Sequence, residues 1–390
     1  MDNKTPKASS GTRQGVFRRL IQGTTTPLAS IFGSGFLVVV SLLASTVGPY
    51  SLFAIIGICA FAYAVGWVIR HNIRHVEPAL AAPSPPRTVR LLEQLSDITL
   101  IPAYIISVTL YLRIMASYVL GYFEADAEIY EKLLTSGIII AILLIELTKG
   151  LKILEGLERW TLIITLAIIF LMIGSFAFYN AAALTAGTLI LPDLPDHSLW
   201  QTVTILCGIL IVVQGFETTR YLGDELDADT RIRASRNSQL FSAAIYILFI
   251  LVATPLMHLL SGDATGNGLI MLATEVAAWL VVPLVFAAVF SQFGAAIAEA
   301  ISASGNIMEL TRHRLTTRVT YIIICGLAIA LTWTADTFEI LALASRAFAF
   351  YFFLQCIIAC DVAKKKGLKA AFAILAALLL FITIFAVPAG

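Results

Sequence analysis

Residues 203–223 read "VTILCGILIVVQGFETTRYLG" and bring a carboxylate and a guanidinium to the end of an apolar run. In water Glu217 and Arg220 would be ordinary, but charged side chains inside a bilayer are costly and usually functional. Gly215 stands directly before them and can adopt backbone angles closed to other residues, so the helix can unwind there. Unwound backbone is tolerated at membrane depth only where protein or a water-filled cavity satisfies it. The stretch therefore predicts a broken transmembrane helix at a buried site.

The composition assigns the chain to the membrane. Of its 390 residues, 59% are hydrophobic and only 13% are charged, and the mean hydropathy is +0.89. A soluble protein of this length would need more polar surface to cover its core. Runs long enough to cross a hydrocarbon layer of about 30 Å recur along the chain. We expect an all-α polytopic membrane protein with about eleven transmembrane helices, near residues 25–47, 50–70, 93–121, 133–149, 159–180, 201–221, 238–260, 276–302, 318–335, 338–361 and 368–388.

The basic residues set the expected orientation. The N-terminal tail, residues 1–24, is polar and basic, and it lacks the apolar core and cleavage site of a signal peptide. With this tail in the cytoplasm, nearly all of the 26 Lys and Arg residues fall on the inner side, while the outer loops are acidic. In most membrane proteins the cytoplasmic loops carry an excess of Lys and Arg, which is known as the positive-inside rule. We expect an integral protein of a bacterial inner (cytoplasmic) membrane, with Gly390 outside.

The sequence carries no sign of a metal, redox or hydrolytic centre. All five cysteines lie within apolar segments, and their spacing matches neither a metal site nor a redox pair. Phosphate-binding loops, HExxH zinc motifs and nucleophile elbows are missing from the sequence. We expect buried thiols without disulfides, no enzyme activity, no cofactor and no nucleic-acid partner. The thiols are Cys59, Cys207, Cys325, Cys356 and Cys360.

A second predicted break suggests an internal repeat. Residues 24–45 read "TTTPLASIFGSGFLVVVSLLAS" and place Gly33, Ser34 and Gly35 in mid-membrane. A glycine pair can also serve close helix packing, since small residues let helices approach. Five predicted spans begin at each break, however, and breaks at matching places in two halves indicate an inverted-repeat transporter with a central site. The predicted repeats are residues 25–180 and 201–361, and a last helix, residues 368–390, lies outside them.

Four motifs resemble the amino acid–polyamine–organocation (APC) superfamily of transporters. "IFGSGF" followed by "TVGPY" resembles its first-span signature, and "GFETTRYLGDELDADTRIR" resembles its sixth-span pattern. "LTKGLKILEGLERW" is similar to the link between spans four and five, and "SQFGAAIAEAISASGNIMEL" resembles the eighth span. The resemblance covers residues 25–361 and leaves the branch of the superfamily open. Asp229 stands about where these permeases usually have proline.

The resemblance implies a substrate site between the two breaks. In the family, the Gly-Ser-Gly break binds the substrate carboxylate, which here implicates Gly33, Ser34 and Gly35. Half-helix N-termini carry a positive partial charge that suits a carboxylate. Gly215 and Phe216 would complete the site, with Phe216 either packing on the substrate or acting as a gate.

Glu217 has three interpretations. It can accept hydrogen bonds from free N–H groups of the opposite break and hold the site open, which we favour. It can instead carry a coupling proton, or contact a substrate ammonium directly. Arg220, one turn further, is expected to snorkel toward water and pair with Glu217 or Asp224, in preference to binding substrate.

Two further arginines fall well inside predicted spans. Arg113 in span three and Arg346 in span ten lie in the outer half of the membrane by the predicted map. We expect a gate or structural pair with Glu339 or another outer acid. Arginine is also a strong carboxylate ligand, so attraction of an anionic substrate is the alternative.

The coupling ion stays open between Na⁺ and H⁺. As in sodium-coupled relatives, Ser291 and first-span carbonyls would hold Na⁺, and span five has no lysine that could replace the ion. Asp97, Glu146 and Glu299 lie toward the cytoplasmic side, where inner-gate pairing or proton release are both open to them.

Together these patterns predict a secondary active transporter. It would carry a small amino acid-like or related organic solute by alternating access, coupled to Na⁺ or H⁺. An inorganic-ion transporter on the same fold is the nearest alternative. A channel, a membrane sensor or a membrane-embedded enzyme is less favoured, because the sequence shows no soluble domain or catalytic constellation.

Overall fold

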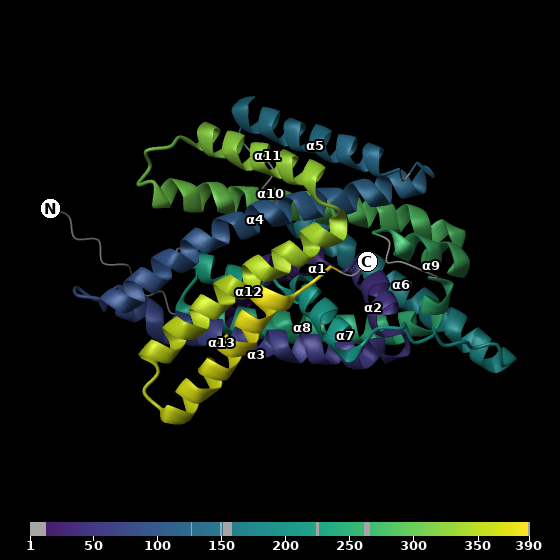
Figure 1. Ribbon diagram of the computed structural model, residues 1–390, viewed down its shortest axis with the longest axis horizontal. Helices are drawn as coiled ribbons and strands as arrows, with labels where there is room; N and C mark the ends of the chain where they lie inside the picture. The colour runs from purple at the N-terminus through teal and green to yellow at the C-terminus, as the bar shows by residue number, and fades with distance from the viewer. Residues whose placement is uncertain are drawn as a thin grey trace.

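The computed structural model describes residues 13–388 except 126, 149, 151–157, 224–225 and 261–265. Within these residues the chain forms helices and turns and no strands (Figure 1). The α-helices are α1 Arg13–Ser34, α2 Val39–Val47, α3 Ser51–Leu80, α4 Arg87–Tyr122, α5 Glu128–Thr148, α6 Glu158–Ala186, α7 Leu199–Gly208, α8 Ala228–Ala253, α9 Gly268–Val276, α10 Val281–Leu310, α11 Thr317–Thr334, α12 Thr337–Val362 and α13 Lys366–Phe385. The short 3₁₀ helices are η1 Gly48–Tyr50, η3 Leu210–Val213, η4 Phe216–Leu222, η5 Thr254–Leu259 and η6 Ala278–Leu280.

The helices have the length and surface of membrane spans. Eight helical runs among the described residues are long and apolar enough, by length and composition, to cross a membrane. Large apolar side chains face outward on many of them; Phe178 and Leu199 are 79% and 81% exposed. In water such a surface would be unfavourable, whereas lipid covers it without cost. The predicted all-α membrane fold is confirmed; the number of crossings and the inverted repeat stay predictions.

Helix ends differ from the predicted spans in several places; α3, for example, continues to Leu80, whereas the second span was expected to end near residue 70. The third span was expected over 93–121, but α4 already begins at Arg87, so its first turns extend the helix beyond the predicted apolar stretch. The eighth was expected from residue 276, but α9 ends there and α10 begins at Val281. An apolar run alone does not show where one helix stops and the next begins.

Both predicted breaks are present in the backbone. The first begins at Gly35, the last residue of the predicted Gly33-Ser34-Gly35 break, because α1 continues through Gly33 to Ser34 and the chain turns over 35–38 before α2 begins. Gly35 closes this turn, since its carbonyl accepts hydrogen bonds from the N–H groups of Val38 and Val39 at 3.2 and 3.0 Å. The second break is at Gly215, as predicted, between η3 and η4.

Helix α4 forms the axis of the molecule. It packs most extensively against α10 and α12, and α1 packs mainly against α8. In Figure 1, α5 and α11 lie together at the upper edge, and α13 runs beside α12. After α13 the chain reaches α7, where the Val387 N–H donates to the Thr204 carbonyl at 3.1 Å. The last helix is thereby tied to one half of the broken sixth helix.

Candidate functional site

The two breaks cross one another at close range. At Gly215 a Cβ would lie 2.7 Å from the Ile31 backbone nitrogen, and the φ angle is +130°. At Gly35 a Cβ would lie 2.6 Å from the Cα of Val212. Only glycine fits a backbone contact of this kind, and only glycine adopts this φ readily. These glycines therefore let the broken helices touch directly.

A tyrosine hydroxyl joins the two broken helices. The Tyr246 hydroxyl on α8 lies 3.1 Å from the Ile31 carbonyl oxygen and 2.8 Å from the Val212 carbonyl oxygen. Backbone carbonyls near helix breaks lack their usual intrahelical donors. The tyrosine supplies a donor at this point, which no sequence motif indicated.

Glu217 is satisfied within its own break. It is fully buried, and its Oε2 accepts a hydrogen bond from the Gly215 N–H at 3.0 Å. Its Oε1 accepts a second hydrogen bond from the side-chain amide of Gln214. The expected N–H partner was in the opposite break, but the structure places it two residues away. Glu217 thus braces the unwound backbone before η4.

A cavity of about 190 Å³ begins at the first break and extends to one side of it, between α1, α6, α10 and η4. We call this the N-terminal side, because α1 begins there. Ala298 and Ser302 in the wall are exposed, so the cavity reaches the surface. Its wall also includes Thr26, Ala29, Ser30, Phe32, Gly33, Tyr104, Thr161, Leu162, Thr165, Thr218, Tyr221, Leu222, Ser291, Gly294, Ala295 and Glu299.

Glu299, which the sequence analysis considered for inner-gate pairing or proton release, lies in the cavity wall. Its side chain is only 5% exposed, and its Oε2 has no hydrogen-bond partner among the described residues. The Thr165 hydroxyl in the same wall is likewise buried without such a partner. Buried polar atoms are almost always hydrogen-bonded, so open ones beside a cavity indicate a ligand position. The spacing of Glu299 on its helix gave no hint of this.

Aromatic side chains pack around the first break. Phe32 stacks on Tyr246 with ring centroids 5.8 Å apart, and Phe36 lies 4.4 Å from Phe249. The Tyr118 hydroxyl donates to the Leu37 carbonyl at 2.7 Å, within the first break.

Phe216 lies away from the cavity wall. Its ring stacks on Phe352 of α12, with centroids 5.3 Å apart and planes 16° from parallel. It is 1% exposed and is absent from the described residues that line the cavity. Of the two expected roles, this position fits a gate better than a direct substrate contact.

Ser291 and Gly33 lie together as expected for a sodium site, but a third side chain joins them. Ser291 on α10 lines the cavity. The Gln292 amide nitrogen donates to the Gly33 carbonyl at 2.8 Å and lies 3.4 Å from the Ser291 hydroxyl. The Gln292 amide therefore hydrogen-bonds to the Gly33 carbonyl, which would be a ligand of a sodium ion in this site.

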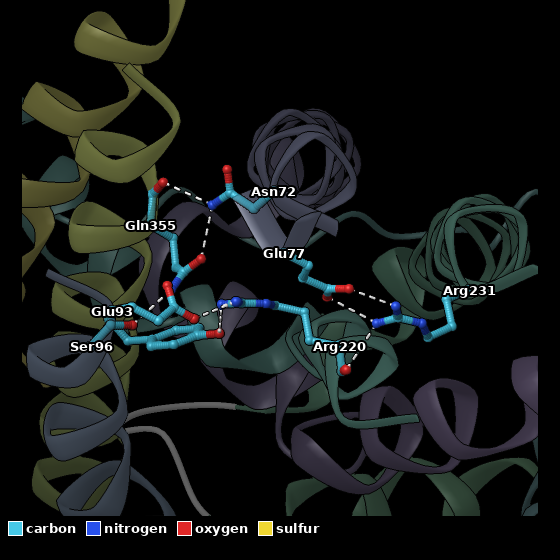
Figure 2. A network of polar contacts seen from close by, with 8 residues as sticks. Asn72, Glu77, Glu93, Ser96, Arg220, Arg231 and Gln355 are labelled. Carbon is cyan, nitrogen blue, oxygen red and sulfur yellow. Dashed lines mark hydrogen bonds and ion pairs between the residues drawn. The ribbon is translucent and has the colours of Figure 1, made fainter. Parts of the chain in front are cut away.

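Arg220 pairs with a helix that the sequence analysis did not consider. Its guanidinium forms an ion pair and hydrogen bond with Glu93 on α4, and it lies 3.5 Å from the Tyr351 hydroxyl (Figure 2). The expected pairing with Glu217 is wrong, because Glu217 faces the break while Arg220 extends to α4. Asp224, the other expected partner, lies outside the described residues. Arg220 thereby connects η4 to α4.

Amide side chains extend this contact to two more helices. Gln355 on α12 donates to the Ser96 hydroxyl at 2.8 Å and approaches Glu93 at 3.4 Å. Asn72 on α3 donates to the Gln355 side chain and backbone at 2.8 and 3.0 Å. Figure 2 shows these groups converging on the Arg220–Glu93 pair. Helices α3, α4 and α12 are therefore linked to η4 through one polar network.

A second ion pair holds η4 through the backbone of the same residue, Arg220. Arg231 on α8 forms two hydrogen bonds with Glu77 on α3, at 2.6 and 2.9 Å, and a third with the Arg220 carbonyl at 3.0 Å (Figure 2). Asp227 begins α8, and two hydrogen bonds from Thr230 hold the pKa of its carboxyl below the usual range. The half-helix η4 is thus anchored on both faces.

The two outer arginines have structural partners. Arg113 is 1% exposed and lies 3.7 Å from Glu131 and 3.2 Å from the Thr337 hydroxyl. Arg346 donates to the backbone carbonyls of Ala386 and Ile384, at 2.7 and 3.4 Å, and so caps α13. Neither pairs with Glu339, which caps α12 together with Asp336. The side chain of Ser34 lies outside what the structure describes.

The described residues contain no group of three or more His, Cys, Asp or Glu that could hold a metal ion. All five cysteines are free, and Cys59, Cys325 and Cys356 are buried. The five thiols thus behave as small packing residues. For Asp97 on α4, the structure gives a half-buried side chain outside the cavity wall.

Three comparisons with known proteins agree with this architecture. A family model described as "APC superfamily transporter" matches residues 16–386. A protein of Aquifex aeolicus (strain VF5), described as uncharacterized, is 39% identical over 377 residues, which cover 94% of this chain and 91% of the relative. Among solved structures, a manganese transporter of Eremococcus coleocola, in complex with an aromatic bis-isothiourea substituted compound, has a TM-score of 0.59 at 11% identity and covers 98% of this chain and 88% of its own. A point mutant of the same transporter has a TM-score of 0.60.

Proposed function

Because this chain belongs to the APC superfamily of transporters, we propose that it is a secondary active carrier of a small amino acid-like or related organic solute. It moves the solute by alternating access, coupled to Na⁺ or H⁺. The observation that carries this proposal is a cavity that starts at the crossing of two broken helices and reaches the surface on the N-terminal side. A carrier caught at one end of its cycle needs this arrangement, because its two sides must never open together.

In this proposal the breaks hold the solute. The turn over 35–38 and the end of α1 present Gly33, Ser34 and Gly35 to a substrate carboxylate, and Gly215, Phe216 and Glu217 complete the site from the other broken helix. Glu217 keeps the second break open, since both of its oxygens are already hydrogen-bonded there. Phe216 acts as a gate through its stack on Phe352.

The cavity side is cytoplasmic in this proposal. The basic residues of the N-terminal tail and of the loops on that side would follow the positive-inside rule. The described state is then inward-open, with Arg220–Glu93 and Arg231–Glu77 holding η4 in place. The two repeats, residues 25–180 and 201–361, would rock against each other to close it, and Gly390 would lie outside.

Protons are the coupling ion that we favour. The Gly33 carbonyl has two lone pairs, and the Gln292 amide takes one of them. Sodium needs several oxygen ligands at close range, so this donor competes with it directly. The fully buried carboxylates Glu217 and Glu299 provide groups that could hold a proton instead.

Counterflow in proteoliposomes tests the carrier proposal. The purified full-length chain is reconstituted, loaded with unlabelled amino acids, amines or organic acids, and supplied with a trace of the same labelled solute outside. A carrier gives saturable uptake that rises when the inside is loaded, because a loaded site returns faster than an empty one. Ohmic current through single openings, without counterflow, would identify a channel and refute the proposal.

An inorganic-ion carrier is the second candidate. Its support is the shared fold with the manganese transporter of Eremococcus coleocola and a carboxylate in the cavity wall. The same proteoliposomes, given Mn²⁺ and a fluorescent indicator inside, separate the two. Saturable Mn²⁺ uptake without exchange of any organic solute would favour the second candidate.

A further inference from the structure

Arg70 on α3 is a buried arginine without an acidic partner among the described residues. It is 8% exposed, and none of the ion pairs found in the described part of the chain includes it. Its Nη1 donates to the side-chain oxygen of Gln239 on α8, and its Nη2 donates to the Tyr63 carbonyl at 3.3 Å. These neutral acceptors engage only part of the five N–H donors of a guanidinium. A buried charge that its neighbours do not neutralise is unfavourable, so a counter-ion from outside would stabilise it.

The Arg70 side chain points back along α3 and not out toward water. The central carbon of its guanidinium lies 4.7 Å from the centre of the Tyr63 ring, about two turns earlier in the helix. Tyr63 and Trp67 are 37% and 39% exposed, and aromatic rings of this kind are typical of the membrane–water interface. The guanidinium therefore lies beside the lipid-facing surface of α3, close to where the predicted second span ends.

Helix α8 brings a second arginine to the same place. Gly66 lets α3 and α8 approach closely, because a Cβ at this position would collide with the Gln239 side chain. The Gln239 amide nitrogen also donates to the Ala62 carbonyl at 2.8 Å. Arg236 is exposed, lies one turn from Gln239 on α8, and repels the positive charge of Arg70. Two guanidinium groups are therefore brought together at the α3–α8 interface.

The acids of these two helices already have partners. Helix α3 contains one acidic residue, Glu77, which pairs with Arg231 at 2.6 Å. Helix α8 also contains one, Asp229, which pairs with Arg74 at 2.8 Å. The two helices together carry five arginines against these two acids. Positive charge is therefore in excess along their contact, and an anion would relieve the repulsion there.

We propose that the α3–α8 interface binds the phosphate group of an anionic membrane phospholipid, with Arg70 and Arg236 as its ligands. A guanidinium can present two parallel N–H groups to phosphate oxygens, which makes arginine a strong phosphate ligand. Leu240, one turn from Arg236 toward the membrane, is 53% exposed and offers the acyl chains an apolar surface. A lipid is favoured over a soluble anion, because its phosphate already lies at this depth beside its acyl chains.

The proposed lipid would link two parts of the chain. Helix α3 lies in the first predicted repeat, residues 25–180, and α8 lies in the second, residues 201–361. A phosphate held by one arginine from each helix would bridge the two repeats at the membrane surface. The inference concerns the outer surface of the protein and does not depend on which solute the carrier moves.

Lipid binding by the wild-type protein is the first test. The purified full chain in detergent is heated with increasing amounts of phosphatidylglycerol, or of phosphatidylcholine with the same acyl chains, whose choline neutralises the phosphate. We expect phosphatidylglycerol to raise the unfolding temperature by several degrees more than phosphatidylcholine does. Inorganic phosphate and glycerol 3-phosphate at the same concentrations should have no effect. Equal shifts from the two lipids, or equally large shifts from the soluble phosphates, would overturn the proposal.

Variants locate the site. Arg236→Gln removes an exposed charge, and we expect about fivefold weaker apparent affinity for phosphatidylglycerol. Arg70→Gln removes the buried guanidinium and should weaken it about tenfold or more. The matched control is Arg318→Gln, which removes an exposed arginine of α11, on the same predicted side of the membrane but at the opposite edge of the molecule in Figure 1. This control should bind the lipid as wild type does.

The comparison between Arg236→Gln and Arg318→Gln decides the proposal even if Arg70→Gln does not fold. Equal losses in these two variants would show a general attraction of anionic lipid to the basic side of the protein, and the inference would be wrong. Unchanged affinity in Arg236→Gln would also overturn it. The binding assay involves no transport, so a failure of counterflow would refute the carrier proposal and leave the lipid site standing.

Discussion

Gln292 donates its side-chain amide to the carbonyl oxygen of Gly33, at 2.8 Å, and so joins α10 to the last turn of α1. Gly33 and Ser291 line the cavity, and the Gln292 amide lies 3.4 Å from the Ser291 hydroxyl. The contact places a fixed N–H donor where sodium-coupled carriers would need an ion. The contact therefore concerns the proposed choice between Na⁺ and H⁺ as the coupling ion.

Uptake is expected to be independent of sodium. When K⁺ replaces Na⁺ on both sides of the proteoliposome, the initial rate should change less than about twofold, because the amide already satisfies Gly33. Collapse of an inward pH gradient should lower accumulation instead. A sodium requirement that persists at fixed pH would contradict this prediction.

Gly215→Ala should impair both stability and uptake. The φ of +130° is strained for alanine, and the new Cβ would lie 2.7 Å from the Ile31 nitrogen. We expect a loss of about 1–3 kcal/mol and a fall in uptake, measured by thermal unfolding and counterflow. The control is Gly174→Ala in α6, where nothing lies within 4 Å of the added carbon. A variant at Gly215 that behaves like this control would show that the break tolerates a side chain.

The variant Glu217→Gln tests whether Glu217 only stabilises the second break or also carries a proton. The glutamine has one acceptor oxygen in place of two, and its NH₂ group must face either the Gln214 amide or the Gly215 N–H. Two donors then oppose each other, which should cost about 1–3 kcal/mol and reduce uptake together with the unfolding temperature. Unchanged stability with normal counterflow but lost response to a pH gradient would assign the proton to Glu217.

The Arg220–Glu93 pair should behave as a buried unit. The side chains are only 7% and 14% exposed, so Glu93→Gln leaves a buried guanidinium without its counter-charge and should destabilise the protein by about 3–5 kcal/mol. The double variant with Arg220→Gln should cost less than the sum of the single variants. Unfolding of the three variants in one detergent measures this coupling.

The control for this cycle is the exposed pair Arg74–Asp229, whose side chains are 55% and 66% exposed. Breaking it should cost about 0–1 kcal/mol, because water and salt screen it. Equal costs for the two pairs would show that burial does not strengthen the contact of η4 with α4.

Arg346→Ala should weaken the fold and leave substrate affinity unchanged. The side chain binds the carbonyls of Ala386 and Ile384 at the end of α13, which the variant leaves without this donor. We expect a loss of about 1–3 kcal/mol on thermal unfolding and the same half-saturation concentration in uptake. A higher half-saturation concentration for anionic solutes alone would restore the alternative role in substrate attraction.

The sequence predicts the breaks well because backbone geometry is encoded locally. Gly215 adopts a φ angle that few other residues accept, so its place before two charged residues is informative by itself. The first break begins only at the last of the three predicted residues, Gly35. Gly33 stays in α1, and its carbonyl accepts a hydrogen bond from Gln292, a residue far away in the chain. Distant contacts of this kind leave no local pattern.

The partners of the charged residues could not be predicted from the sequence, because they too are distant in the chain. Arg220 meets Glu93, which lies in another helix, and the periodicity of either segment does not point to the other. The importance of Glu299 depends on what is missing around it, and this becomes visible only when α1, α6 and α10 are packed. Sequence reasoning placed it toward the cytoplasmic side and left inner-gate pairing and proton release open.

The Tyr246 hydroxyl lies between two carbonyls, at Ile31 and Val212, but it has one proton. At any moment only one of the two broken helices receives the hydrogen bond, and the other carbonyl competes for it. A small relative shift of the helices can therefore pass the proton from one acceptor to the other without leaving the donor empty. The centre of the protein thus offers two alternative hydrogen bonds to one donor, and the exchange between them requires only a rotation of the Tyr246 hydroxyl.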